Sequence, residues 1–292
     1  MKRPVEKKEE IGTTGHVWDG IEELNNPLPR WWLWCLYACI VWAVGYSIAY
    51  PAWPLIKGAT PGLLGYSTRA NVAADIAEVD AANAELIAEL AAVDLTAISE
   101  NEELHRFAIN AGGSVFRANC SQCHGSNAAG TKGYPNLLDD DWLWGGSIDE
   151  IAFTVTHGVR NEQSPDSRWT EMPAFADILN REEIDQVVAH VMVISGQDAD
   201  ATLAAAGATV YLDNCASCHG DAGEGLRDLG APVLNDAIWL YGGDAETIEA
   251  TVRNARFGVM PAWSETFRAA SGLTQAEINA VAAYVHQLGG GE

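Results

Sequence analysis

One long apolar run interrupts the otherwise mixed hydropathy of the chain. Residues 31–56 read WWLWCLYACIVWAVGYSIAYPAWPLI, and no charged residue lies among them. The twenty residues from Trp31 to Tyr50 would span about 30 Å as a helix, which matches the thickness of a bilayer core. Pro51 and Pro54 then end the regular helix. This run predicts a single transmembrane helix within residues 31–56.

Aromatic side chains mark both ends of this run, as expected at the two membrane interfaces: Trp31, Trp32, Trp34, Tyr50 and Trp53. A signal peptide has a shorter apolar part and a small-residue cleavage site, so we expect the helix to be retained. A buried core helix would be shorter and less uniformly apolar. Five basic residues precede the run and only Lys57 and Arg69 follow it closely. This asymmetry favours a cytoplasmic segment at residues 1–30.

Apolar residues return with helical spacing in the connector that follows, residues 57–105. A Gly/Pro-rich stretch opens it, and a stripe with a period of three or four positions then runs through residues 70–98. The positions of the stripe are Ile76, Val79, Asn83, Leu86, Leu90, Val93 and Ala97. The stripe predicts an amphipathic helix. The pattern leaves open whether this helix docks on a partner or packs on its own domain.

The rest of the chain repeats itself. NCSQCHG at 119–125 returns as NCASCHG at 214–220, and EMPAF at 171–175 returns as VMPAW at 259–263. Such a repeat predicts two duplicated, mostly helical domains, at residues 106–196 and 203–292. Each opens with a short helix that leads into the Cys-x-x-Cys-His unit. Each closes with an amphipathic helix after an Asn or Thr N-cap, in NREEI and TQAEI.

Charge is distributed unevenly along the chain. The formal net charge is −23, and residues 1–57 hold six basic and six acidic residues, so the whole excess lies in residues 58–292. An acidic surface of this size repels nucleic acid and anionic lipid head groups, and it attracts basic proteins. The composition therefore argues against a nucleic-acid partner.

The repeated Cys-x-x-Cys-His unit is typical of covalent haem attachment. Two thiols on one helical turn face the same way and add across the two vinyl groups of a haem, and the adjacent histidine supplies an axial iron ligand. The sequence thus predicts two covalently bound haem c groups. The expected residues are Cys120, Cys123 and His124 for one haem, and Cys215, Cys218 and His219 for the other.

Three other readings of the cysteines are open. The two pairs together would make a Cys₄ zinc site, but a single shared metal does not require the repeated histidine and its repeated surroundings. A thioredoxin-like redox pair expects a strand before the motif and no adjacent histidine. A structural disulfide between cysteines three residues apart would be strained.

Methionine is the expected sixth ligand, because Met/His ligation raises the iron potential and closes the site to outside ligands. Met172 and Met260 each precede a proline in a loop, once per block. We take each methionine to serve the haem of its own block. Met192 lies within a helix and suits core packing, whereas His157 is a rival ligand in the first block. His190 has a tyrosine as its counterpart.

The expected cellular compartment follows from the covalent attachment of haem. Haem is attached covalently outside the bacterial cytoplasmic membrane, in an oxidising space. We therefore expect both haem domains in the periplasm and a single-pass anchor in the inner membrane, with the amino terminus in the cytoplasm.

The fold class is thus mainly α, with one N-terminal transmembrane helix and two tandem class I cytochrome c domains. In this respect the chain resembles the dihaem subunit, subunit III or P, of cbb₃-type cytochrome c oxidases. The resemblance includes HVWDGIEELNNPLPRWWLW (16–34), YPAWP (50–54), NLLDDDWLWGG (136–146), HGVR (157–160) and both Met-Pro loops. The string before the helix is the most particular of these.

The resemblance implies a respiratory electron-transport role. The family's dihaem subunit accepts electrons from a soluble periplasmic cytochrome c and passes them to a monohaem cytochrome c subunit. From there they reach a haem–copper catalytic subunit, which reduces oxygen and pumps protons. This chain has one span and only His16 near it, so we expect no oxygen-reducing centre of its own. The alternatives are a dihaem carrier for another membrane reductase or dehydrogenase, a haem-based gas or redox sensor, and an assembly or docking protein.

Overall fold

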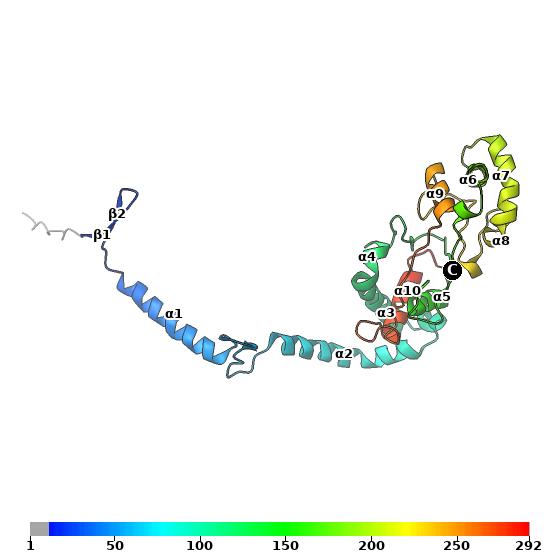
Figure 1. The fold of residues 1–292 in the computed structure, drawn as a ribbon. Helices are drawn as coiled ribbons and strands as arrows, with labels where there is room; N and C mark the ends of the chain where they lie inside the picture. The colour runs from blue at the N-terminus through cyan, green and yellow to red at the C-terminus, as the bar shows by residue number, and fades with distance from the viewer. Residues whose placement is uncertain (1–11, 292) are drawn as a thin grey trace, which may run out of the picture. The chain divides into compact units, whose positions relative to one another are not determined.

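A computed structural model describes residues 12–291 of the chain. The chain divides into two compact units between Ala82 and Asn83, and each unit is treated separately below. The described residues are mainly helical, as expected (Figure 1). Four of the five basic residues that favour a cytoplasmic amino terminus lie among residues 1–11, outside the described residues.

The first unit contains the candidate membrane helix and a hairpin before it. Strands β1 (Thr13–Trp18) and β2 (Ile21–Leu24) pair antiparallel, and the turn between them places Asp19 and Gly20 at φ 48° and 84°. Helix α1 follows at Arg30–Ala49, and a two-residue pair of strands, β3 (Pro54–Leu55) and β4 (Gly58–Ala59), comes after it.

Helix α1 is the one described helix that is long and apolar enough to cross a membrane, with a mean hydropathy of 1.6 and no buried residue. Its 20 residues correspond to about 30 Å, the thickness of a bilayer core. The helix ends before Pro51, as the sequence predicts. Helix α1 is therefore a candidate membrane span by its length and composition.

The helix expected over residues 70–98 is present as helix α2 (Thr68–Ala92), which begins two residues earlier and ends six residues earlier than expected. A 3₁₀ helix, η1 (Leu95–Glu100), follows it. Leu90, near the end of α2, is buried with Ile98 and Leu104. The side-chain amide of Asn279 donates to the Leu90 carbonyl oxygen at 2.8 Å. The carboxyl end of α2 therefore packs on its own domain, whereas Val72 and Ile76 nearer its start are exposed.

The second unit has the same order of α-helices in both blocks, whereas the π-helical and 3₁₀ turns differ in number and place. The first block contains α3 (Glu102–Val115), the π-helical turn η2 (Phe116–Cys120), α4 (Ser121–His124), α5 (Ile148–His157), the 3₁₀ helix η3 (Phe175–Asp177) and α6 (Arg181–Ile194). The second block contains α7 (Ala201–Asn214), α8 (Ala216–His219), the 3₁₀ helix η4 (Arg227–Leu229), α9 (Ala245–Asn254) and α10 (Gln275–His286). Capping boxes begin both closing helices, at Asn180 with Glu183 and at Thr274 with Glu277, which confirms the predicted N-caps.

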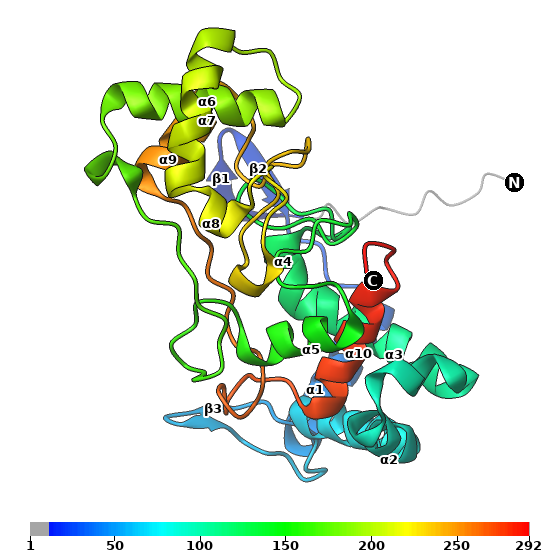
Figure 2. The ribbon, with the colours of Figure 1, turned by 90° about the vertical axis from the view of Figure 1, so that its right-hand side faces the viewer.

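The closing helices are exchanged between the blocks. Helix α10 of the second block packs on α3 and α5 of the first, and α6 of the first block packs on α7 and α9 of the second. Figure 2 shows α10 beside α3 and α5, with α6, α7 and α9 gathered together. The two domains at 106–196 and 203–292 are therefore repeats in sequence, but neither is closed by its own last helix.

Equivalent glycines make the two exchanged helix crossings. A Cβ atom on Gly112 of α3 would collide with the backbone carbonyl of Ala280 in α10. A Cβ atom on Gly207 of α7 would collide in the same way with Gln186 in α6. Gly112 and Gly207 occupy the same place in the repeat, as do Gln186 and Ala280. The same close crossing is thus formed twice, each time between one helix from each block.

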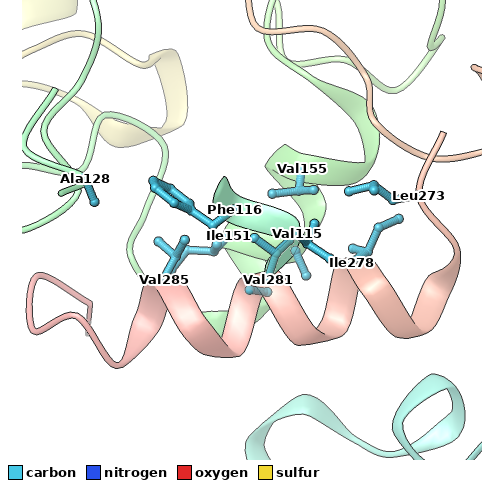
Figure 3. Close-up of a cluster of buried hydrophobic side chains, with 11 residues drawn as sticks. Val115, Phe116, Ala128, Ile151, Val155, Leu273, Ile278, Val281 and Val285 are labelled. Atoms are coloured by element: carbon cyan, nitrogen blue, oxygen red, sulfur yellow. The ribbon is translucent and has the colours of Figure 1, made fainter. Parts of the chain in front are cut away.

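Each crossing encloses a hydrophobic core made by both blocks. The first core combines Val115, Phe116, Ile151 and Val155 with Leu273, Ile278, Val281 and Val285 (Figure 3). The second core combines Phe175, Ile184, Val187, Val188 and Val191 with Tyr211, Ile248 and Val252. Two cores of mixed origin hold the second unit together.

Candidate haem-binding sites

Each Cys-x-x-Cys-His unit lies at the end of the helix that opens its block. In the first block α3 passes through the π-helical turn η2 into α4, which ends at His124. In the second block α7 leads directly into α8, which ends at His219. π-Helical turns are frequent at functional sites. A helix leading into each motif was predicted from the sequence and is confirmed.

Both histidines are held by a backbone carbonyl from a downstream loop. Nδ1 of His124 lies 3.0 Å from the carbonyl oxygen of Pro135, and Nδ1 of His219 lies 2.9 Å from that of Pro232. A carbonyl only accepts, so Nδ1 carries the proton and Nε2 keeps a free lone pair. Burial lowers the pKa of both imidazoles, against a smaller raising effect of these hydrogen bonds. Each ring is therefore neutral and has one nitrogen available to a metal.

These carbonyls were not anticipated from the sequence. The signal that would have found them is a proline 11 residues after His124 and 13 residues after His219, in equivalent loops.

One thiol of each pair is half-buried. Burial raises the pKa of Cys120 to about 11, with a smaller contribution from Cys123. Burial likewise raises the pKa of Cys215 to about 11, with a smaller contribution from Cys218. Cys123 and Cys218 are exposed.

The two loop methionines lie on opposite cores from the ones expected. Met260 of the second block packs on the first core, together with Cys120. Met172 of the first block packs on the second core, together with Cys215. The expectation that each methionine serves its own block therefore does not agree with the structure. The exchange of the closing helices carries the preceding methionine loops with it.

Aromatic side chains near the motifs follow the same exchange. Trp142 of the first block and Trp263 of the second pack on the first core. Trp239 of the second block packs on the second core, where Phe175 of the first block is buried. Both cores thus present one tryptophan from the loop after the histidine and one aromatic residue from the methionine loop of the other block.

The rival ligands have other contacts. Nδ1 of His157 lies 2.9 Å from the Ser164 hydroxyl, and the ring lies against Phe153 and Phe267. The ring of His190 packs on Tyr211 at 5.1 Å between centroids. Met192 on α6 also packs on the second core. Met192 has His286 as its repeat counterpart, so the repeat points to Met172 as the sulfur ligand of that site.

The other readings of the cysteines fit the geometry poorly. Cys120 and Cys215 lie on different cores, and the described residues contain no group of three or more His, Cys, Asp or Glu side chains suited to a metal ion. A Cys₄ zinc site is therefore not formed by them. Helices precede both motifs instead of the strand of a thioredoxin-like pair. All six cysteines are free in the structure.

The residues present fit a haem at each core. A motif cysteine, a loop methionine and aromatic side chains pack on each core, and the neutral imidazole of the same motif follows that cysteine by four residues. Nη1 of Arg268 is buried without a hydrogen-bond partner among the described residues. The guanidinium of Arg268 lies 4.4 Å from the ring centroid of Trp263, which packs on the first core. A buried guanidinium nitrogen that lacks an acceptor beside this core suits an anionic group such as a haem propionate.

Known families match the chain in three places. A family described as the N-terminal domain of cytochrome oxidase-cbb3, FixP, matches residues 10–57. Subunit III of cbb3-type cytochrome c oxidase matches residues 107–191, and the cytochrome c family matches residues 204–289. An apolar helix followed by two cytochrome c domains fits a membrane-anchored electron-transfer subunit that binds haem c, as the sequence predicts.

Curated relatives match over nearly the whole chain. The cbb3-type cytochrome c oxidase subunit CcoP of Cereibacter sphaeroides is 59% identical over 100% of this chain and 99% of its own length. Subunit CcoP of Rhodobacter capsulatus is 54% identical over 100% of this chain and 99% of its own length. Subunit FixP of Sinorhizobium medicae is 48% identical over 97% of this chain and 96% of its own length. With the three family matches and the paired helix–histidine sites, this similarity shows that the chain belongs to the CcoP/FixP family of cbb₃-type cytochrome c oxidase subunits.

Proposed function

We propose that this chain holds two covalently bound haem c groups and relays electrons, one at a time, from a soluble cytochrome c to the other subunits of a cbb₃-type oxidase. One observation carries the proposal above the others. Each core brings together a Cys-x-x-Cys-His helix with a fixed imidazole and a loop methionine from the other block.

The residues divide into two equivalent sets. Cys120 and Cys123 would form the thioethers of the first haem, with His124 and Met260 as its axial ligands. Cys215 and Cys218 would form those of the second, with His219 and Met172 as axial ligands. A haem c with Met/His ligation supplies reversible one-electron transfer at a raised potential and leaves no position for an outside ligand. The protein fixes each imidazole through the Pro135 or Pro232 carbonyl.

Localisation follows from the attachment chemistry. Haem is attached covalently outside the cytoplasmic membrane, so the second unit belongs in the periplasm and helix α1 is a single-pass inner-membrane anchor with a cytoplasmic amino terminus. The expected partners are a monohaem cytochrome c subunit and a haem–copper catalytic subunit. Purification through a tag on this chain should yield copper and b-type haem in the same complex. Their absence would favour another membrane reductase or dehydrogenase as the partner.

Covalent attachment is tested by extraction and mass. Acid–acetone treatment of the denatured full-length chain should leave its colour in the protein. The intact mass should exceed the polypeptide by two haem groups. A colourless protein, or a mass increase of one haem, would contradict the proposal.

Axial ligation is tested by three methionine variants of the full-length, haem-loaded chain in detergent. Met260→Ala and Met172→Ala should each lower the potential of one haem and allow it to bind one carbon monoxide per chain, because a coordination position opens. Met192→Ala is the matched control, since it removes a methionine from the second core without removing a proposed ligand. If carbon monoxide binds to the control variant instead of Met172→Ala, Met192 is the ligand.

The acidic surface suits a basic donor cytochrome. The whole excess of −23 lies in residues 58–292, which contain both haem sites. Attraction between oppositely charged proteins speeds their encounter and is screened within about 8 Å at physiological salt. The bimolecular rate of reduction by a basic cytochrome c should therefore fall steeply as salt is added. A rate independent of salt would refute electrostatic steering.

A further inference from the structure

The two methionine loops meet at one short segment, Gly158–Arg160, which directly follows helix α5. Gly158 ends the helix at φ 73°, and its amide donates to the Thr154 carbonyl at 2.8 Å. Arg160 has φ 52°, a value that non-glycine residues adopt rarely and that surrounding contacts must hold in place. The contacts made by these three residues show what holds them.

The backbone of this segment pairs with the Met260 loop. The amide of Val159 donates to the Met260 carbonyl and the amide of Met260 donates to the Val159 carbonyl, each at 3.0 Å. A Cβ atom on Gly158 would collide with the Met260 carbonyl oxygen and with the amide of Ala262. Glycine therefore permits the close approach, and the paired hydrogen bonds fix the position of Met260 along the segment.

The side chain of Arg160 bonds to both methionine loops at once. Nε donates to the Thr170 carbonyl oxygen at 2.6 Å, and Nη1 donates to the Gly258 carbonyl oxygen at 2.9 Å. Each acceptor lies two residues before a methionine, Thr170 before Met172 and Gly258 before Met260. The planar guanidinium fixes the spacing of its donors, so a single side chain sets the distance between the two loops.

The bond from Arg160 to Thr170 is partly buried, and the bond to Gly258 is exposed. The side chain is half-buried, and burial lowers the pKa of its guanidinium, with Glu171 acting in the opposite direction. The guanidinium remains a cation, because an arginine is protonated throughout the physiological range. Its carbon lies 5.7 Å from the ring centroid of Phe257. Charge-assisted hydrogen bonds at a partly dry site are about twice as strong as neutral ones.

We propose that Arg160 is a positioning residue for both axial methionines, so that one side chain supports the ligation of the two haems together. The inference rests on the proposed ligation by Met172 and Met260. It adds that the two sites are linked, because Arg160 of the first block donates to a loop of each block. Loss of the guanidinium should release both loops, although neither methionine is changed.

The test uses Arg160→Gln in the full-length, haem-loaded chain in detergent, with carbon monoxide as the probe. We expect the fraction of chains in which a methionine has left the iron to rise about ten-fold at each haem, the factor for losing one charge-assisted bond. The far-red sulfur-to-iron absorption of the oxidised protein should weaken, and the reduced protein should bind carbon monoxide at both haems at about a tenth of the concentration that the wild type needs. Binding limited to one haem, or to neither, would overturn the proposal.

Arg168→Gln is the matched control. Arg168 is also half-buried, and its Nη1 donates to the Trp144 carbonyl and the Thr154 hydroxyl, each at 2.8 Å. Its side chain bonds to neither methionine loop in the structure. This variant should lose stability but keep the sulfur-to-iron absorption at both haems. Equal loss of that absorption in Arg168→Gln would show that Arg160 acts only through general stability and would overturn the proposal.

A milder variant covers the case in which Arg160→Gln does not accumulate. Arg160→Lys keeps the charge, but a single ammonium does not reproduce the two-armed fork. It should show the same change at both haems in weaker form, and wild-type behaviour would overturn the proposal. If the wild-type chain itself lacks the sulfur-to-iron absorption, the proposed methionine ligation fails, which is a separate result.

Discussion

The exchange of closing helices makes a sharp prediction for two equivalent isoleucines. Ile278 lies in the second block but belongs to the first core, and Ile184 lies in the first block but belongs to the second core. Both are 1% exposed. They occupy the same place in the repeat, so Ile278→Ala and Ile184→Ala are matched perturbations that differ only in which core they weaken.

The expected magnitude follows from their burial. Removing three carbon atoms from a fully buried isoleucine and leaving a cavity costs about 2–5 kcal/mol. Because each 1.4 kcal/mol is a factor of ten, local opening should become at least about 30 times more frequent in the weakened core. A change of that size is readily measured by amide hydrogen exchange.

The assay is hydrogen exchange with mass spectrometry on the full-length, haem-loaded chain. Ile278→Ala should speed exchange in residues 102–124 of the first block and leave residues 201–219 unchanged. Ile184→Ala should do the reverse. If each variant instead loosened the opening helix of its own block, the two domains would be self-contained and the exchanged arrangement would be refuted.

Two further predictions concern stability, each checked by thermal unfolding of the full-length chain. Burial, with repulsion from Asp236, raises the pKa of Asp141 to about 6 from 3.8, so its charge reduces stability as pH rises between these values. Asp141→Asn should stabilise the protein by about 1 kcal/mol at pH 7.5, a value discounted for partial solvent exposure, and should have no effect below pH 4. Destabilisation at pH 7.5 would contradict this account. The Tyr211 hydroxyl donates to the Gly220 carbonyl at 2.9 Å, so Tyr211→Phe should cost about 1 kcal/mol, or about 2–4 °C in Tm. The ring itself should fit, because Phe116 occupies the equivalent position, and an unchanged Tm would show that the hydrogen bond contributes nothing.

Features set by local chemistry could be predicted from the sequence. The end of α1 before Pro51 follows from the missing amide of proline, and the starts of α6 and α10 follow from the Asn180 and Thr274 capping boxes. The Cys-x-x-Cys-His units fall at helix ends for the same reason, since their spacing already implies a helical turn. Each of these depends on residues within a few positions of one another.

The β1–β2 hairpin was missed although its signal is present. Asp19-Gly20 is a favoured pair for a two-residue hairpin turn, and both residues have the positive φ that such a turn requires. The flanking strands are short, and every one of their residues is exposed. Without a buried face there is no alternation of apolar and polar residues to mark them as strands.

The role of Arg160 could not be predicted from the sequence, where this residue is only part of the HGVR string. An arginine that bonds to two backbone carbonyls leaves no pattern at either acceptor, because any residue type supplies a carbonyl oxygen. The acceptors lie 10 and 98 residues away in sequence. Such a contact can be found only from the folded chain.

The helix exchange has a different cause, which lies in the connection between the blocks. The repeat places equivalent residues at both crossings. The sequence pattern alone therefore allows α6 or α10 to pack on either α3 or α7. The connection distinguishes them, since α6 ends at Ile194 and α7 begins at Ala201. Helices joined by so short a segment usually pack side by side, and here α6 packs on α7, which leaves α3 to be closed by α10. Each proposed haem site then takes residues from both blocks, so neither block can separate from the other without unpacking a core. The fold, rather than a flexible linker, then fixes the spacing of the two proposed sites.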